Sequence, residues 1–100
     1  MSLDVFVACA VAVTLPDQLP PDGAWKRYEA RGNIWFASEH IAQSWQLIVS
    51  LEDSAEFKLP AGKKHVVGLS LEGNSDNGLP LLEKTVDALT KSCNGVLLET

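Results

Sequence analysis

The last third of the chain has the clearest pattern of apolar and polar positions. Its apolar residues recur at spacings of four, three and four, at Leu82, Val86, Leu89 and Cys93. This spacing places them on one side of an α-helix. Pro80 suits the first turn of such a helix, and Asn94 followed by Gly95 supplies a left-handed stop. The pattern predicts an amphipathic helix between these two signals.

Strands are predicted at the beginning, in the middle and at the end of the chain. Leu3 to Thr14 is rich in β-branched residues and does not alternate between apolar and polar positions, which is typical of a strand inside a sheet. Short aromatic and β-branched runs at residues 33–38, 44–51 and 65–71 predict three more strands. Residues 95–100, after the helix, predict a short closing strand.

Three segments between these elements are harder to assign. Residues 15–23 contain three prolines and an Asp-Gly pair, and predict a turn-rich surface loop. Residues 24–32 fit either one or two helical turns closed by Gly32 or an edge strand, and their Lys, Arg, Glu and Ala content favours the helix. Residues 39–43 fit a tight loop or a helical turn capped by Ser38.

Together the elements predict a single globular domain over residues 1–100, of the α/β (α+β) class. We expect a mixed, mainly antiparallel sheet of about five strands, with the C-terminal helix packed on one face and a closing strand. The strand at 65–71, the helix and the last strand form a βαβ unit. Its two strands should therefore run parallel, directly paired or one strand apart, with a right-handed crossover.

The composition favours a cytoplasmic protein with a core of its own. The chain is 46% hydrophobic, and its longest apolar run, Val5 to Val13, is half the roughly 18 residues that a membrane helix needs. No Lys or Arg precedes that run, unlike in a secretory signal. Cys9 and Cys93 are expected to be buried free thiols, with a disulfide as the alternative.

The charge balance bears on the class of partner. Thirteen acidic and eight basic residues give a net charge of −5, which disfavours binding to nucleic acid or to an anionic membrane. Two interpretations stay open: a charge that only keeps the protein in solution, and a surface matched to a basic partner.

The glycine-flanked segment Gly73–Gly78 lies where α/β proteins often hold a phosphate. A P-loop needs a Lys and then Ser or Thr after its second glycine, but here Leu79 and Pro80 follow. Asn, Asp and Ser also satisfy backbone groups in turns. We therefore expect a connection in which Asp76 or Asn77 caps the helix.

No catalytic set, metal site or cofactor site is predicted. Adjacent residues on a strand point to opposite faces, so Glu39 and His40 would not act as a pair. His40 and His65 also have no Cys or His neighbour at the short spacing of a zinc site. We therefore expect both histidines to be structural and the protein not to be an enzyme.

The overall layout resembles a known family. The chain begins with the strand "LDVFVACAVAV" and closes with "LPLLEKTVDALTKSCNGVLLET", a helix followed by Asn-Gly and a last strand. This is similar to the small acidic immunity proteins of bacterial contact-dependent growth inhibition systems. The resemblance implies a protein that binds and neutralises a cognate toxin domain, often a basic nuclease, and that has no catalytic activity of its own.

Charge placement suggests which residues would contact such a toxin. The candidates are the acidic residues of two loops, Glu52, Asp53 and Glu56 in the first and Glu72 and Asp76 in the second. Two alternatives stay open beside inhibition of a toxin. One is a small enzyme or enzyme subunit whose site assembles at a dimer interface, and the other is a regulatory domain that binds a small ligand.

Overall fold

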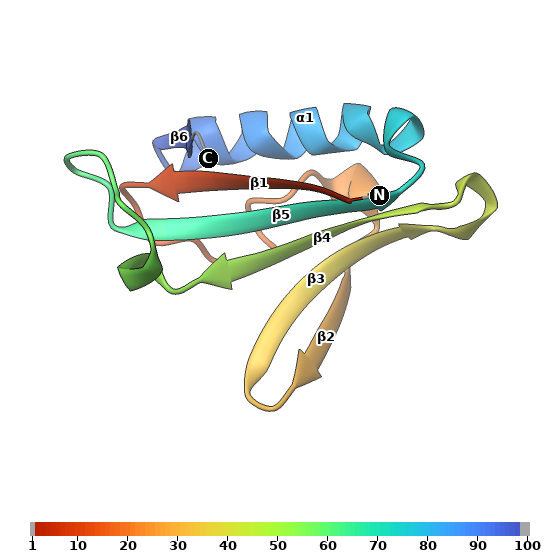
Figure 1. Ribbon diagram of the computed structural model, residues 1–100, viewed down its shortest axis with the longest axis horizontal. Helices are drawn as coiled ribbons and strands as arrows, with labels where there is room; N and C mark the ends of the chain where they lie inside the picture. Colours follow the sequence, from red (N-terminus) through yellow and green to blue (C-terminus); the bar gives the residue numbers. More distant parts are fainter. Residues whose placement is uncertain (1, 99–100) are drawn as a thin grey trace.

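The computed structural model describes residues 2–98, apart from the side chain of Ser75, as one six-stranded sheet with an α-helix on one face (Figure 1). The strand order is β2-β3-β4-β5-β1-β6, and all neighbouring strands are antiparallel. The α+β class is confirmed, whereas the expected mixed sheet of about five strands is corrected to six antiparallel ones. The elements are β1 (Ser2–Cys9), β2 (Lys26–Ala30), β3 (Asn33–His40), β4 (Trp45–Glu52), β5 (His65–Gly73), α1 (Ser75–Ser92) and β6 (Gly95–Leu98).

Strand β1 lies between β5 and β6 and runs antiparallel to both. β5 and β6 are therefore parallel to each other with one strand between them, as the βαβ pattern predicted. β1 ends at Cys9 rather than at Thr14, because the chain turns out of the sheet there. The backbone N–H groups of Ala10 and Val11 both donate to the carbonyl of Cys93, at 3.2 and 3.3 Å. Val13 is buried in the core, but it belongs to the loop after β1 and not to a strand.

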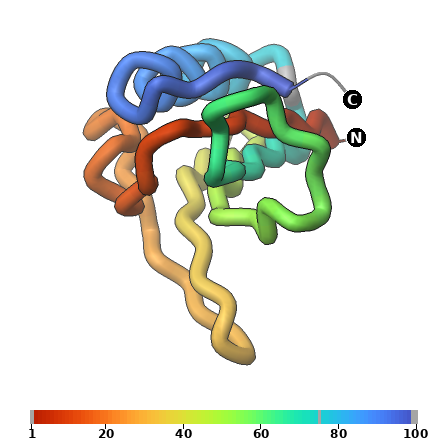
Figure 2. Tube along the Cα trace, turned by 90° about the vertical axis from the view of Figure 1, so that its left-hand side faces the viewer, coloured from red at the N-terminus to blue at the C-terminus, as the bar shows by residue number. Residues whose placement is uncertain are grey.

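Residues 26–30 form the edge strand β2, not the helix that their propensity favoured. The two residues after it, Arg31 and Gly32, have φ values of 53° and 83°, which suit a tight hairpin turn into β3. Tyr28 on β2 stacks on Trp35 on β3, with ring centroids 5.8 Å apart. This cross-strand contact, available only in the sheet, outweighs weak local preferences. The β2–β3 hairpin projects from the body of the domain (Figure 2).

Helix α1 begins at Ser75, five residues before the expected Pro80, so most of the glycine-flanked segment is the first helical turn. Asn74 occupies the N-cap position instead of Asp76 or Asn77, and its backbone N–H donates to the carbonyl of Ser44 at 2.8 Å. The helix ends as predicted, with Asn94 in the left-handed conformation at a φ of 49°.

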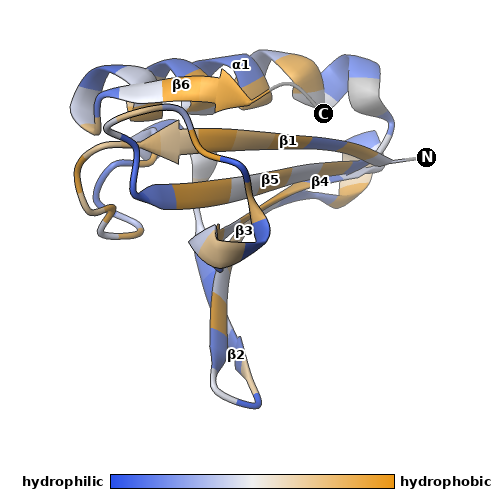
Figure 3. Ribbon diagram, turned by 60° about the vertical axis from the view of Figure 1, so that its left-hand side comes forward, coloured by the Kyte–Doolittle hydropathy of each residue, from blue (hydrophilic) through white to orange (hydrophobic). Residues whose placement is uncertain are grey.

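The core lies between α1 and the sheet. Leu82, Leu89 and Cys93 are buried and Val86 is partly buried, which confirms the predicted helix face. They pack against aliphatic residues of three central strands, Val7, Leu47, Val49, Val67, Leu69 and Leu71. Apolar residues also predominate on β1 and β6 beside the helix, whereas the tip of the β2–β3 hairpin is mainly polar (Figure 3).

Candidate functional site

The sheet has two unlike faces, and the candidate site lies on the one opposite α1, which we call the open face. Because strand residues alternate between faces, the neighbours of the core residues point to the open face. The strand register aligns one row of them across the sheet: Tyr28, Trp35, Ser50, Gly68 and Phe6. The β4–β5 connection covers one end of the row, where Phe57 packs on Phe6 with ring centroids 5.0 Å apart.

Four carboxylates also belong to the open face: Asp4, Glu39, Glu52 and Glu72. Two of them have partners within the face. Glu39 accepts a hydrogen bond from the Tyr28 hydroxyl and lies 3.7 Å from the Lys26 ammonium. Glu72 accepts a hydrogen bond from the Gln46 side chain at 2.9 Å. The hydrogen bond to Glu39 raises the pKa of Tyr28 above its ordinary value, and burial and the Glu39 charge add to this effect.

Glu52 differs from these two carboxylates in its surroundings. Within residues 2–98 its side chain takes part in no hydrogen bond or ion pair, and the residue is exposed. Its side chain lies over Gly68, where a Cβ atom would be 2.4 Å from Oε1 of Glu52. The missing side chain at Gly68 therefore makes room for the Glu52 carboxylate.

The five candidate residues from the sequence do not form one cluster. Glu52 and Glu72 share the open face, but they lie opposite Val66 and Gln46, at the two ends of the sheet. Six residues of strand separate these positions, about 20 Å at 3.3 Å per residue.

The other three candidates lie off the sheet. Asp53 and Glu56 follow Glu52 in the β4–β5 connection, where Asp53 accepts a hydrogen bond from the backbone N–H of Ala55 at 3.0 Å. Asp76 lies in the first turn of α1, on the other side of the sheet. Only Glu52, Asp53 and Glu56 are therefore neighbours.

Sequence reasoning missed Asp4, Glu39 and Trp35. Asp4 and Trp35 stand within predicted strands, so charge placement in loops could not find them. Glu39 opens the segment 39–43 and was considered only as a partner for His40. The signal that could have found them is alternation, because each directly neighbours a residue that faces the core.

A groove crosses the open face between two aromatic walls. Trp35, backed by Tyr28, forms one wall, and Phe6, backed by Phe57, forms the other. Between them lie only Ser50 and Gly68, two small residues on neighbouring strands. Three strand spacings of about 4.8 Å put the strands that carry the walls roughly 14 Å apart.

The groove widens where β3 and β4 part. Their register ends at Trp35 and Ser50, while β3 stays paired with β2 and β4 with β5. The opening has a volume of about 740 Å³ and adjoins a hollow of about 210 Å³ over β5 and β1. Both are lined by Ile48, Ser50 and Glu52. We call the two together the trough.

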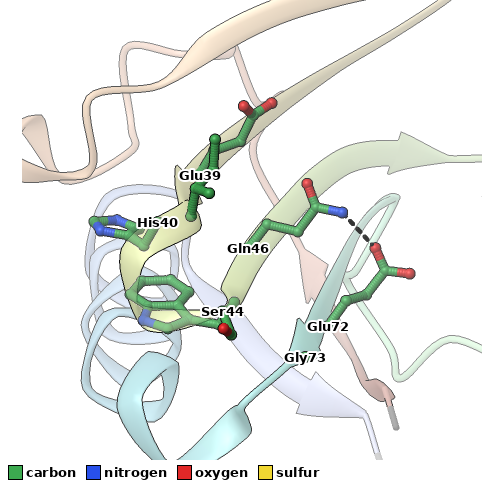
Figure 4. A pocket seen from close by; sticks show the side chains of 8 residues that line it. Glu39, His40, Ser44, Gln46, Glu72 and Gly73 are labelled. Carbon is green, nitrogen blue, oxygen red and sulfur yellow. Dashed lines mark hydrogen bonds between the residues drawn. The ribbon is translucent and has the colours of Figure 1, made fainter.

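A second hollow, of about 330 Å³, contains His40 at the opposite end of β3 (Figure 4). Ser38 Oγ lies 2.9 Å from Nε2 of His40 and donates its proton to the carbonyl of Gly23. His40 therefore donates from Nε2 to Ser38, which is fully buried. This pair ties β3 to the preceding loop and presents no exposed hydroxyl. Ser38 also caps no helical turn, because β3 continues to His40.

His40 and Glu39 do not work as a pair. Figure 4 shows their side chains diverging, as expected for neighbours on a strand. The imidazole of His40 stacks on the indole of Trp45, with ring centroids 4.0 Å apart. Across residues 2–98, no three His, Cys, Asp or Glu side chains are grouped so that they could hold a metal ion.

Cys9 and Cys93 are buried free thiols. Burial, and then the proximity of Cys93, raise the pKa of Cys9 to about 11. Within the described part of the chain, no helix is both long and apolar enough to cross a membrane. Comparison with protein-family models, with curated protein sequences and with solved structures gives no match.

Proposed function

We propose that this protein binds and neutralises a cognate basic toxin domain by protein–protein inhibition, the function that its resemblance to small immunity proteins implies. The observation that supports the proposal best is the open face, which carries Asp4, Glu39, Glu52 and Glu72 on a sheet that α1 covers only from the other side. In this proposal the open face and the adjoining β4–β5 connection form the binding surface.

The physical basis is charge complementarity. A nuclease toxin must be basic where it holds phosphates, and an acidic inhibitor uses the same field to associate quickly and to cover that surface. Of the carboxylates on the open face, Glu52 is followed at once by Asp53 and, three residues later, by Glu56 in the connection. The carboxylates of Glu52, Asp53 and Glu56 thus come together in sequence beside the trough, and the three lysines of the same connection, Lys58, Lys63 and Lys64, follow later in it.

The hairpin adds apolar contact area. Trp35 and Tyr28 present a half-buried aromatic pair on the same face as the carboxylates, and aromatic residues are enriched where protein interfaces bind most strongly. Acidic and aromatic side chains side by side suit a partner surface that is basic and in part apolar.

The test uses a candidate toxin domain, chosen from the genes that neighbour this one, and measures association by stopped-flow fluorescence at several salt concentrations. Exposed charges are screened over about 10 Å at 0.1 M salt, so association should slow markedly as salt rises. The double variant Glu52→Lys and Asp53→Lys should slow it further.

The matched control is the double variant Glu83→Lys and Asp87→Lys on the exposed side of α1, which changes the net charge equally. It should slow association less than the first variant. Association that ignores salt, or equal effects of the two variants, would contradict binding through the open face. No binding of the toxin at all would rule out the proposed function.

A further inference from the structure

We propose that the trough binds the side chain of one arginine that projects from the protein partner. Its guanidinium group would stack on the indole of Trp35 and pair with the carboxylate of Glu52. That the partner is a basic protein rests on the proposed function, but the chemistry of the site follows from the trough itself.

The walls of the trough suit the apolar parts of an arginine. Tyr28 stacks on one side of Trp35, and the residue that pairs with Trp35 on the other side is the small Ser50. The indole of Trp35 therefore has a side that faces the trough. Ile48, which points to the same face as Trp35, lines both hollows of the trough, and Ile34 and Leu51, which alternate to the other face, border the opening where β3 and β4 part. The methylene groups of a long side chain would cover this apolar surface, while its charged end would keep polar contacts.

The floor of the trough supplies the charge. Glu52 lies over Gly68 and, within the described residues, has no cation beside it, in contrast to Glu39 with Lys26. Asp4 lines the adjoining hollow and adds a second negative charge, and the hydroxyls of Ser50 and Ser70 line it as well. A cation that enters the trough would therefore meet carboxylate and hydroxyl oxygens rather than a competing positive group.

Guanidinium fits this combination better than ammonium does. It is planar, so it can stack on an indole while its N–H groups pair with a carboxylate through two parallel hydrogen bonds. A lysine ammonium is a strongly hydrated point charge and would use the carboxylate but not the flat aromatic wall as well. The site is thus expected to distinguish arginine from lysine.

Gly68 provides a way to test the geometry without changing the charge. The three atoms nearest to a Cβ at Gly68 all belong to the flexible side chain of Glu52. In Gly68→Ala only that side chain has to move, so the protein should fold while its carboxylate is displaced from the floor of the trough. Glu52→Gln removes the charge with little change of shape.

The experiment titrates ¹⁵N-labelled protein with an acetylated and amidated peptide, Gly-Ser-Arg-Ser-Gly, and follows the chemical shifts by NMR. Saturable shifts are expected at the backbone amides of Ser50 and Gly68 and at the indole N–H of Trp35. Peptides with lysine and with uncharged citrulline in place of arginine are the ligand controls. Binding should weaken in the order arginine, lysine, citrulline.

Gly68→Ala and Glu52→Gln should each weaken binding of the arginine peptide about tenfold, the size of one charge-assisted contact. Trp35→Leu should weaken it about threefold through loss of the cation–π contact. Glu72→Gln, which removes a carboxylate of the open face outside the trough, should have less than about a twofold effect.

Equal shifts with the arginine and citrulline peptides, or a response to Glu72→Gln as large as to Glu52→Gln, would overturn the proposal. The result is separable from the proposed function. A toxin that binds Gly68→Ala as well as it binds the unchanged protein would remove the trough from the interface and leave inhibition standing. If the trough selects arginine but the protein binds no toxin, the proposal for the trough stands and the proposed inhibition of a toxin fails.

Discussion

Strand β5 illustrates how differently the two faces of the sheet are built. On the side of α1 it presents Val67, Leu69 and Leu71, which are almost completely buried. On the open face it presents Gly68, Ser70 and Glu72, and Val66, which precedes them on this face, is 1% exposed. Alternate residues of one strand thus serve stability on one face and leave a small, polar surface on the other. The comparison predicts that substitutions on the two faces have different consequences.

The largest difference is expected between two aliphatic truncations. Leu89 lies on the buried side of α1 and is fully buried, so Leu89→Ala should lower the free energy of unfolding by about 2 to 5 kcal/mol. Ile48 is only half-buried on the open face, and Ile48→Ala should cost about 1 kcal/mol. Urea denaturation of both variants measures the contrast. A loss under about 0.5 kcal/mol for Leu89→Ala would mean that the helix packs through another side.

Two glycines, Gly78 in the core and Gly68 on the open face, allow the two faces to be compared by adding a methyl group instead of removing a side chain. A Cβ at Gly78 would lie 2.5 Å from Leu71 Cδ1 and 2.8 Å from the Trp45 ring, inside the core. Overpacking of this kind costs about 1 to 3 kcal/mol and the better helix propensity of alanine returns about 1, so Gly78→Ala should destabilise by about 1 kcal/mol.

Gly68→Ala on the open face should change the free energy of unfolding by less than about 0.5 kcal/mol, because only the end of Glu52 must move. Both glycine variants are compared by urea denaturation. A destabilisation of Gly68→Ala as large as that of Gly78→Ala would show that the open face is as tightly packed as the covered one.

The cysteines report on the covered face through their chemistry. Both are buried, and the pKa of Cys9 is raised to about 11 from an ordinary 9.0, so the folded state favours the thiol. The stabilisation from this group is complete below pH 9 and is lost as the pH rises through about 11. At pH 8 the native protein should react slowly with Ellman's reagent, and the protein unfolded without reductant should release two equivalents at once. A mass two units lower with no reactive thiol would instead indicate a disulfide.

The smallest expected effect is a change in the titration of Tyr28 on the open face. Tyr28 is the only tyrosine of the chain, so phenolate absorbance reads its titration directly. Its hydrogen bond to Glu39 holds its pKa above the ordinary value, and the stabilisation is therefore present at neutral pH and lost as the pH rises through that raised pKa. Glu39→Gln should move the pKa back towards the ordinary value. An unchanged titration in this variant would mean that the hydrogen bond does not persist in solution.

How much of the fold the sequence predicts depends on the range of the interactions that decide each element. The apolar face of α1 and the left-handed stop at Asn94, just after the helix, follow from local spacing and turn chemistry, and both were predicted. Its start was misplaced, because Gly78 reads as a turn signal when its packing against Trp45 is unknown. β2 was assigned to a helix, because its pairing with β3 and the contact of Tyr28 with Trp35 are not local properties.

The candidate site depended even more on long-range register. Charge alone pointed to Glu52 and Glu72, which lie on the open face, and to Asp76, which lies on the other side of the sheet. Asp4 and Trp35 join Glu52 only because β1, β5, β4 and β3 align in one register. No residue spacing along the chain encodes that alignment, so the trough could not be predicted from the sequence.

The position of β1 between β5 and β6 has a consequence for the order of assembly. β1 is synthesised before every other strand of this domain, yet both of its partners are synthesised last. Its pairing must therefore close loops that span most of the domain, an arrangement of high contact order that folds slowly. Until β5 has been synthesised the apolar stretch of β1 has no strand to pair with, and a nascent chain in that state exposes a segment that is prone to aggregate.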